Sequence, residues 1–277
     1  MDKINLNEVY LNHFPEDDSN EIYFEPISLS GLDEMHKYSV KEEFYEFFEF
    51  NAFKSKAETE QYLKKLMSRT KLTDGDIQAM YWFVRRKADN ALIGTATLVN
   101  INKSRESAEI GYGIDPSFWG KGYILTLQNA LIKYTFETLK FNRLHGITMV
   151  NNERTISSIY AAGFKKEGII RDYYLKDKRF IDGLKYSMLK KEFLEERNSI
   201  KKINGAVNQK DVIKIISKAL EEEVDINSTM LNTENWDSIH HFIIIVAIQD
   251  QLNIKFPTHQ ISSLRSVKSI ISAIQSS

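Results

Sequence analysis

Two glycines stand two residues apart in "PSFWGKGYILTLQNALI", just before a run with helical periodicity. Gly120 and Gly122 let the backbone approach a ligand closely, and the first N–H groups of the helix that follows have no partner inside it. These donors and the positive end of the helix dipole suit an anion such as a phosphate. Tight turns and helix caps need the same residues, so a purely structural role stays open on this segment alone.

Near the other end of the chain, Ser238 heads the apolar run "SIHHFIIIVAIQDQL". Apolar residues repeat after it with helical spacing, at Ile239, Phe242, Ile243 and Val246. An Asp-Ser pair before such a run satisfies free backbone N–H groups. The first residue of a helix is also a favourable position for an attached phosphodiester, because free N–H groups and the helix dipole face it. Capping the helix and carrying a modification are compatible roles.

The composition narrows the class of protein. No cysteine occurs, which removes disulfides, thiolate metal sites and a cysteine nucleophile and fits the reducing cytoplasm. The 37 basic and 38 acidic residues are evenly mixed, so no nucleic-acid partner is indicated. The N-terminus is polar and the longest unbroken apolar stretch is only Phe242 to Ile248, which indicates neither export nor a membrane span. No cluster has metal-ligand spacing, and we expect a cytoplasmic protein that acts on a small molecule.

Alternating apolar and polar residues predict the strands that must position the glycine turn. They cover Glu21–Ser28, Met80–Lys87, Ala91–Ile101, Ser107–Ile114, Arg143–Val150, Phe164–Leu175 and Gly183–Phe193. Helical segments lie between them, near Leu32–Tyr38, Lys56–Arg69, Gly122–Leu139 and Asn152–Ala162. Asp89-Asn90 and Asp182-Gly183 are expected at hairpin turns. The pattern predicts an α+β sheet flanked by helices.

A change of composition divides the chain in two. Residues 196–209 lose the apolar period and are rich in charge and Asn, which is typical of a linker. Residues 1–195 form the first predicted domain, and residues 210–277 the second. The second has helical periodicity around Val212–Leu220, Ser238–Leu252 and Val267–Ile274 and needs no strand, so a small all-helical bundle is expected.

Three separated segments of the first domain resemble one enzyme superfamily. "PSFWGKGY", "NNERTISSIYAAGF" and the hairpin "KKEGIIRDYYLKDKRFIDGLKYSML" are similar, in that order, to the GNAT N-acyltransferases. The resemblance covers roughly Ile22 to Phe193 and is to the branch that acetylates protein N-termini, polyamines and amino sugars. It implies the GNAT fold, a mixed and mostly antiparallel sheet. In that fold the sheet splays apart after the strand Ser107–Ile114, where the thioester enters.

The resemblance also implies the donor and its contacts. The pyrophosphate of coenzyme A, bound as acetyl-CoA or another acyl-CoA, would meet the backbone amides of Trp119, Gly120, Lys121, Gly122, Tyr123 and Ile124. Asn152 would lie beside the pantetheine arm. Relatives usually have Gly or Ala where Ile124 stands. Many carry a general-acid tyrosine in the position that Ile159 fills here, so Tyr160, one residue later, is the candidate acid.

Transfer of an acyl group to an amine needs two further groups. The attacking amine must lose its proton to a base or a water chain, and the oxyanion needs a hydrogen-bond donor. Glu109, on the strand before the splay, is the candidate base, and an ordinary sheet-surface carboxylate is its structural alternative. His145 alternates on the neighbouring strand and is the second candidate.

The second domain resembles an acyl carrier protein from its first loop to its last helix. The Asp-Ser-Ile, the apolar helix, the segment "NIKFP" and the helix "SVKSIISAI" follow the order of that family. The resemblance implies 4′-phosphopantetheine on Ser238, added by a phosphopantetheinyl transferase and charged by an acyl-loading enzyme. His240 and His241 stand where carrier proteins usually have acidic residues. A partner fused in the same chain would not need strong steering by charge.

Together the two resemblances predict an N-acyltransferase, because both domains handle the same pantetheine thioester. The donor is acyl-CoA or acyl-phosphopantetheine on Ser238, delivered through a linker that spans roughly 20 Å and gives about millimolar effective concentration. The predicted acceptor is a small-molecule primary amine, first the amino group of a nucleotide-linked sugar, by analogy with similar enzymes. The alternatives are a protein N-terminus or a polyamine acetylated from acetyl-CoA, and a non-catalytic GNAT-like module that docks the carrier domain.

Overall fold

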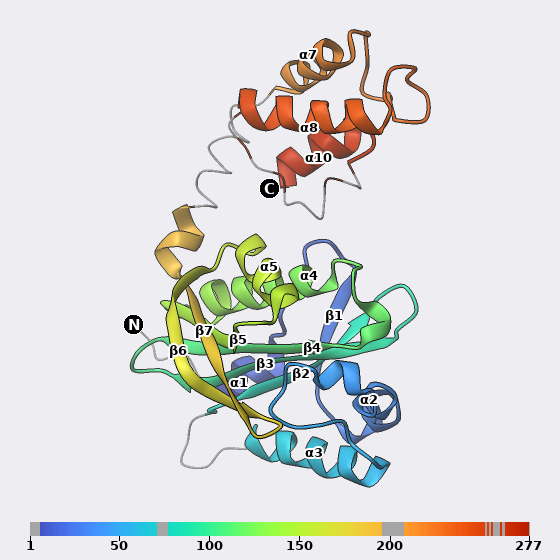
Figure 1. Ribbon diagram of the computed structural model, residues 1–277. Coiled ribbons are helices and arrows are strands. Elements are labelled where there is room, and N and C mark those ends of the chain that lie inside the picture. The colour runs from blue at the N-terminus through green and yellow to red at the C-terminus, as the bar shows by residue number, and fades with distance from the viewer. Residues whose placement is uncertain are drawn as a thin grey trace. The chain divides into compact units, whose positions relative to one another are not determined.

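Figure 1 shows the computed structural model of the chain. The structure describes residues 6–70, 77–195, 208–252, 254, 256, 261 and 264–276. The chain divides into two compact units, unit 1 (Met1–Lys190) and unit 2 (Lys191–Ser277). The linker predicted at 196–209 lies almost entirely outside the described residues, and its last residue, Gln209, already begins a helix.

Unit 1 is built around one seven-stranded sheet in the order β1-β2-β3-β4-β5-β7-β6. The strands are β1 (Ile22–Pro26), β2 (Met80–Arg86), β3 (Leu92–Asn102), β4 (Ser107–Ile114), β5 (Arg143–Met149), β6 (Lys165–Lys176) and β7 (Arg179–Leu189). Every neighbouring pair is antiparallel except β4 and β5, which run parallel. The predicted mixed, mostly antiparallel sheet is confirmed.

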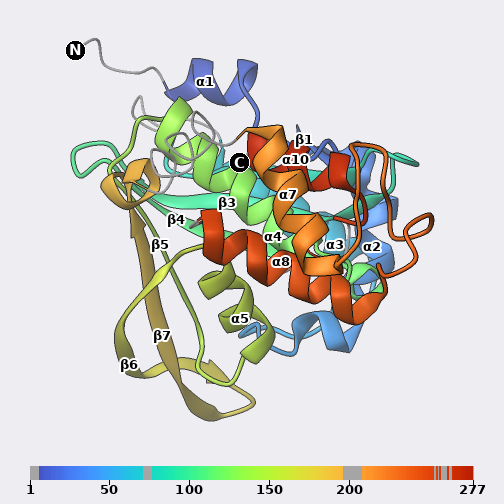
Figure 2. The ribbon, with the colours of Figure 1, turned by 90° about the horizontal axis from the view of Figure 1, so that it is seen from above.

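Helices cover both faces of this sheet (Figure 1). On one face lie α2 (Leu32–Ser39) and α3 (Lys56–Arg69), and on the other lie α4 (Tyr123–Lys133) and α5 (Glu153–Ala161). The view from above shows α5 beside the long β6-β7 hairpin (Figure 2). The predicted helices are found, although the one predicted over Gly122–Leu139 consists of α4 and a π-helical turn over Tyr134–Thr138. The sequence did not predict α1 (Leu6–Asn12).

The strands β4 and β5 separate soon after they meet. Only Ser107–Glu109 pairs with Arg143–His145, although β4 continues to Ile114 and β5 to Met149. Beyond that point β4 stays paired with β3 and β5 stays paired with β7. The sheet therefore opens between two strands that each keep one partner, as the resemblance to GNAT enzymes implies. We call this place the β4-β5 opening.

The turn of the β6-β7 hairpin lies at Asp177-Lys178 and not at the predicted Asp182-Gly183. Both turn residues have left-handed backbone conformations, with φ of 49° and 64°, which suits a two-residue hairpin turn. Gly183 lies inside β7, where a Cβ atom would come within 2.8 Å of Ile147. Close packing and not a turn explains that glycine, and the strand predicted over Gly183–Phe193 begins earlier, at Arg179. The other predicted turn, Asp89-Asn90, is confirmed by the left-handed Asn90 (φ 60°).

Unit 2 contains α7 (Gln209–Leu220), α8 (Ser238–Leu252) and α10 (Val267–Ser276). These helices share one apolar core, which includes Ile216, Trp236, Ile244, Ile245, Ile248 and Ile270. Its described residues hold a single isolated bridge, Thr229 to Ser266, and no strand. The apolar residues of α8 point both into this core and away from it, since Ile239 and Phe242 are 71% and 61% exposed.

Candidate functional site

The glycine turn follows β4 and is anchored before the two glycines. Asp115 caps the short helical turn after β4, accepting a hydrogen bond from the Ser117 N–H at 3.0 Å. Lys41 forms an ion pair with the same carboxylate at 2.6 Å. The indole N–H of Trp119 donates to the Ile114 carbonyl at 2.7 Å. The start of the loop between β4 and α4 is therefore fixed to the sheet.

Gly120 and Gly122 both have left-handed backbone conformations, with φ of +72° and +86°. A Cβ atom at either position would meet nothing within 4 Å, so both glycines border open space. The helix α4 begins at Tyr123 without a side-chain cap, and Ile124 is partly exposed. Among the described residues, the N–H groups of Gly120, Lys121 and Gly122 have no acceptor. The turn thus presents free donors at the positive end of a helix, which suits a phosphate.

Three cationic side chains lie near the aromatic rings of this turn, and the two arginines among them, Arg86 and Arg154, also form ion pairs with Asp89 and Glu46. The guanidinium of Arg154 lies 3.9 Å from the centre of the Trp119 ring. Lys121 and Arg86 lie 5.2 Å and 4.9 Å from the centre of the Phe118 ring. Free donors, open space and nearby cations together fit the pyrophosphate of coenzyme A.

Asn152 lies where β5 gives way to α5. Its side-chain oxygen accepts a hydrogen bond from the Thr155 N–H at 3.2 Å and so caps α5, and the residue is 9% exposed. Because β5 has lost its pairing with β4 well before this point, Asn152 follows the part of the strand that pairs only with β7. Capping gives this asparagine a structural role that is compatible with the implied contact to a pantetheine arm.

Glu109 and His145 are direct neighbours at the last paired position of β4 and β5. Side chains of a strand alternate between faces, and Gly113, further along β4, packs against Phe44, so both groups share the face that carries α2 and α3. Glu109 accepts a hydrogen bond from Asn100 at 2.8 Å. Burial lowers the pKa of His145 although the charge of Glu109 acts in the opposite direction, and its Nδ1 is buried without a partner among the described residues. A neutral imidazole therefore lies beside a carboxylate at neutral pH.

On the same face, the carboxylates of Glu109 and Glu49 act on the phenol groups of Tyr173 and Tyr174. Burial, followed by the charges of Glu109 and Glu49, raises the pKa of Tyr173. Burial also raises the pKa of Tyr174, and the same two carboxylates add to it. Glu49 is fixed near these tyrosines because its carboxylate accepts from the Leu175 N–H at 3.1 Å. A positively charged amine would be attracted to this part of the molecule.

No hydrogen bond or ring contact between Tyr160 and the other predicted residues is found among the described residues. Its side chain is 48% exposed on α5, whereas Ile159 beside it is fully buried. Three polar side chains that the sequence analysis missed, Tyr112, Gln128 and Ser158, meet instead between β4, α4 and α5. Two features of the sequence could have indicated this cluster. They are a tyrosine that shares a strand face with the isoleucines of "AEIGYGI" and a glutamine inside the apolar segment "LTLQNALI".

Ser238 is the first residue of α8 and is exposed. Asp237 caps the helix, since its Oδ1 accepts from the N–H groups of Ile239 and His240 at 2.9 Å and 2.8 Å. Hydrogen bonds from the backbone and then the ring of His240 lower the pKa of Asp237. Among the described residues, the Ser238 hydroxyl has no side-chain partner. His241 is only 8% exposed and belongs to the interior, so His240 alone of the two histidines faces solvent.

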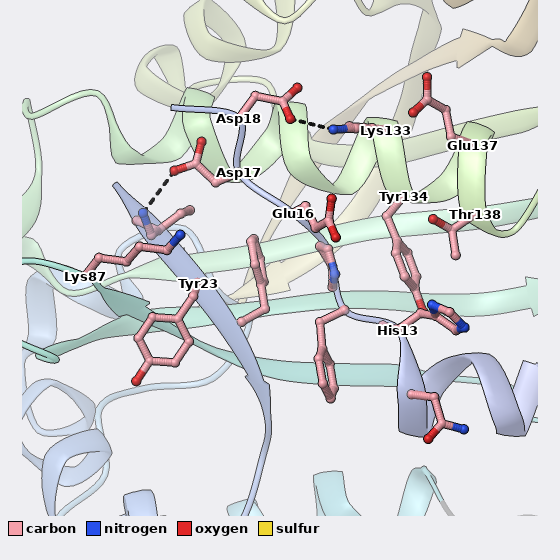
Figure 3. Close-up of a pocket in the computed structure, with 15 residues that line it drawn as sticks. His13, Glu16, Asp17, Asp18, Tyr23, Lys87, Lys133, Tyr134, Glu137 and Thr138 are labelled. Atoms are coloured by element: carbon pink, nitrogen blue, oxygen red, sulfur yellow. Dashed lines mark hydrogen bonds and ion pairs between the residues drawn. The ribbon is translucent and has the colours of Figure 1, made fainter. Parts of the chain in front are cut away.

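A pocket of about 610 Å³ lies elsewhere in unit 1 (Figure 3). It is lined by the segment from Asn12 to Asp18, by β1 and by the end of α4, where Lys133 forms an ion pair with Asp18. None of the predicted site residues lines it. Within the described residues, no group of three or more His, Asp or Glu side chains could hold a metal ion. No described helix combines the length and the apolar character needed to cross a bilayer.

Two sequence relatives point to the same chemistry. Over 116 residues the chain is 34% identical to the uncharacterized N-acetyltransferase p20 of Bacillus licheniformis, a match that covers 42% of this chain and 65% of that protein. Over 105 residues it is 30% identical to the ribosomal protein uS5 alanine N-acetyltransferase of Escherichia coli strain K12, covering 38% of this chain and 54% of that protein. The chain thus spans less than two thirds of the length of either relative.

A solved structure and a family model extend the comparison. The crystal structure of spermidine N-acetyltransferase from Vibrio cholerae, in complex with CoA and spermine, matches with a TM-score of 0.55 and 22% identity. The match covers 63% of this chain and 98% of that chain, which shows a common fold. The family model for the acetyltransferase (GNAT) domain matches residues 21–165, more than half of the 277 residues. The chain therefore belongs to the GNAT acetyltransferase family.

Proposed function

We propose that unit 1 is an N-acyltransferase that moves an acyl group from a pantetheine thioester to a primary amine. The proposal is carried by the β4-β5 opening, which lies between the free donors of the glycine turn and the Glu109–His145 pair. Acetyl-CoA or another acyl-CoA supplies the reactive thioester when bound. Membership of the GNAT family supports this assignment.

Several groups of this chain would serve the transfer. The N–H groups of Gly120, Lys121 and Gly122 would hold the phosphates of a bound CoA at the start of α4. Glu109 takes the proton of the incoming ammonium, so that a neutral nitrogen reaches the carbonyl carbon. His145, kept neutral by burial, is placed to pass that proton on. Beyond Glu109, β4 has no pairing with β5, so its backbone N–H groups on that side are the donors for the oxyanion.

The acceptor side favours a cationic amine. The carboxylates of Glu109 and Glu49 both act on Tyr173 and Tyr174, so they attract an ammonium group and repel the diphosphate of a nucleotide. The relatives named above act on spermidine and on an alanine of a ribosomal protein. We therefore place a polyamine or a peptide N-terminus ahead of the nucleotide-linked sugar that the sequence analysis preferred.

The test is the release of free thiol from acetyl-CoA in the presence of an amine panel. Spermidine, a peptide that begins with alanine and a nucleotide-linked amino sugar represent the three acceptor classes. We expect release that depends on both enzyme and amine, and an acetylated amine by mass spectrometry, with the first or second acceptor. If acetyl-CoA stabilised the protein against heat but no amine were acetylated, the result would contradict an enzymatic function. It would favour the non-catalytic docking module.

We further propose that unit 2 carries 4′-phosphopantetheine on Ser238. The support is an exposed hydroxyl at the first residue of α8, on a helix that Asp237 already caps. An added phosphodiester would lie there at the positive end of the helix dipole. A cytoplasmic phosphopantetheinyl transferase would add the group, and an acyl-loading enzyme would charge it. The loaded arm would then serve unit 1 in place of acyl-CoA.

The intact mass of the purified chain tests this second proposal. After co-expression with a phosphopantetheinyl transferase, we expect the wild type to gain the mass of one phosphopantetheine. The Ser238→Ala variant should gain nothing. An unmodified wild type, or an equal gain in both proteins, would contradict the assignment of Ser238.

A further inference from the structure

Two buried side chains flank the exposed start of α8. Trp236 is 2% exposed and His241 is 8% exposed, whereas Asp237, Ser238 and Ile239 between them are exposed. The indole N–H of Trp236 donates to Nδ1 of His241 at 3.3 Å, and the two ring planes lie 23° apart. The exposed residues around Ser238 therefore lie between two residues that are fixed inside unit 2.

The same histidine contacts a third segment of unit 2. Its Nε2 lies 2.8 Å from the carbonyl oxygen of Ile261. A carbonyl oxygen only accepts and an indole N–H only donates, so Nε2 carries the hydrogen and Nδ1 is the acceptor. Both hydrogen bonds thus require one tautomer of the neutral imidazole. We call these contacts the Trp236–His241–Ile261 bridge.

The loop before α8 is also fixed to the end of α7. The side-chain amide of Asn235 donates to the Leu220 carbonyl at 3.2 Å, and the backbone N–H of Asn235 donates to the Glu222 carboxylate at 3.0 Å. Within α8, the backbone N–H of His241 donates to the Asp237 carbonyl at 2.8 Å. The start of α8 is therefore placed by directional hydrogen bonds in addition to apolar packing.

The polar character of this bridge calls for a reason other than stability. Among the described residues of unit 2, the only buried polar side chains are those of Thr233 and His241, and the rest of the core is apolar. Replacement of hydrogen-bonded partners by apolar groups of the same shape can be nearly neutral for stability. Apolar contacts have no direction, whereas a fully satisfied polar network specifies one arrangement. The bridge therefore fixes the position of the helix start.

We propose that His241 is a positioning residue for the modification of Ser238 and that it acts through the Trp236–His241–Ile261 bridge. The proposal rests on the phosphopantetheine attachment proposed above. In that step the Ser238 oxygen forms a bond to the phosphorus that carries the pantetheine of CoA, and the bond from this phosphorus to the bridging oxygen breaks. The electron pair leaves with adenosine 3′,5′-bisphosphate, and the hydroxyl proton goes to the transferase. Since attack must be in line with the leaving oxygen, a displaced Ser238 would react slowly.

The test measures the transfer of phosphopantetheine from CoA to the full chain by a phosphopantetheinyl transferase, with intact mass as the readout. For His241→Phe we expect kcat to fall about tenfold, because misplacement of a reacting group by about 1 Å costs up to about 100-fold. KM for the chain should stay close to the wild-type value. His241→Gln keeps one donor and one acceptor, so it should recover part of the rate.

Two controls separate positioning from stability and from a general effect of histidine loss. Ile248→Val weakens the same apolar core but leaves the bridge intact, so it should lower the thermal midpoint and keep the wild-type kcat. His240→Phe changes the neighbouring histidine, which has no part in the bridge, and it should also keep kcat. Near-ultraviolet circular dichroism shows whether each variant is folded, and His241→Gln carries the test if His241→Phe is not.

Hydrogen exchange tests the bridge without any modification. The backbone N–H groups of Ile239 and His240 donate to Asp237, and their exchange should be faster in His241→Phe than in the wild type. Faster exchange with an unchanged kcat would overturn the proposal, as would an equal loss of kcat in Ile248→Val or His240→Phe. A wild-type chain that gains no phosphopantetheine would contradict the proposed attachment itself, and exchange would still show whether the bridge fixes the start of α8.

Discussion

At the scale of single residues, the proposed binding of coenzyme A would depend most directly on the left-handed glycines. We predict that Gly122→Ala weakens CoA binding by about tenfold, because alanine in the left-handed region costs roughly 1–2 kcal/mol. Its Cβ would also enter the open space that the phosphates need, since nothing of the protein lies within 4 Å. Isothermal titration calorimetry with CoA measures the change.

The matched control for this substitution is Gly168→Ala on β6. A Cβ atom at Gly168 also meets nothing within 4 Å, but the residue is outside the left-handed region. CoA affinity in this control should equal that of the wild type. Equal affinity losses at both glycines, or none at Gly122, would show that the turn does not bind the phosphates.

The choice of base is a second prediction at this scale. Glu109→Gln should lower kcat by about 10²–10⁴-fold, since a general base contributes that much. His145→Gln should lower kcat less, because the carboxylate remains. We also expect the wild type to lose rate as pH falls through the lowered pKa of His145, and this loss should be absent from His145→Gln. Rates are measured by thiol release between pH 5.5 and 9, a range in the region where histidine titrates. A larger loss in His145→Gln than in Glu109→Gln would make the histidine the base.

At the scale of elements, one ion pair ties the β6-β7 hairpin to β5. Glu167 accepts two hydrogen bonds from Arg143, at 2.5 Å and 2.7 Å, and one from Ser187 at 2.8 Å. Hydrogen bonding to Arg143 is the largest cause that lowers the pKa of Glu167, to about 2. An unfolded glutamate titrates near pH 4.3, so the stability from this pair is fully present above about pH 5 and is lost as pH falls toward 2.

Replacement of this glutamate tests the argument. Glu167→Gln should lower the free energy of unfolding at pH 7 by about 1 kcal/mol, the upper end for a partly exposed pair, because the contact is bidentate. The difference from the wild type should shrink as pH falls below the range in which the glutamate is charged. Urea unfolding at neutral and acid pH measures both values, with Glu60→Gln on α3, an exposed ion pair with Lys64, as the control. A difference that does not change with pH would refute the electrostatic explanation.

Local patterns predicted most elements, and particular residues explain the exceptions. The alternation of apolar and polar residues predicted β4 with its observed bounds, because helices or loops cover both faces of this strand. It misplaced the turn of the last hairpin, since Gly183 serves close packing and Asp177-Lys178 has no sequence signal as strong as Asp-Gly. The β4-β5 opening followed from the resemblance and not from periodicity, because pairing between distant strands leaves no local trace.

The candidate site also contains one part that the sequence predicted and one part that it did not. The glycine turn was predictable because adjacent residues in the sequence make it, and left-handed φ values at Gly120 and Gly122 are what only glycine adopts freely. The cluster of Tyr112, Gln128 and Ser158 was not predictable, because each side chain comes from a different element. Only the fold brings them within hydrogen-bond distance.

At the scale of the whole molecule, we predict that acyl transfer from Ser238 occurs within one chain. A tether gives about millimolar effective concentration, so the rate constant should not change when the protein is diluted. A mixture of acyl-loaded Glu109→Gln, which keeps the arm but lacks the base, with unloaded Ser238→Ala, which keeps the base but lacks the arm, should react much more slowly at micromolar concentration. A mixture as fast as the loaded wild type would show that the tether has no role.

The most direct test of the account follows the mass of the acyl-loaded wild-type chain after an amine is added in a single turnover. The account predicts that the chain loses one acyl group, that the amine gains it, and that Glu109→Gln retains its acyl group under the same conditions. An acyl group that stays on the wild-type chain, or leaves at the same rate without amine, would contradict it.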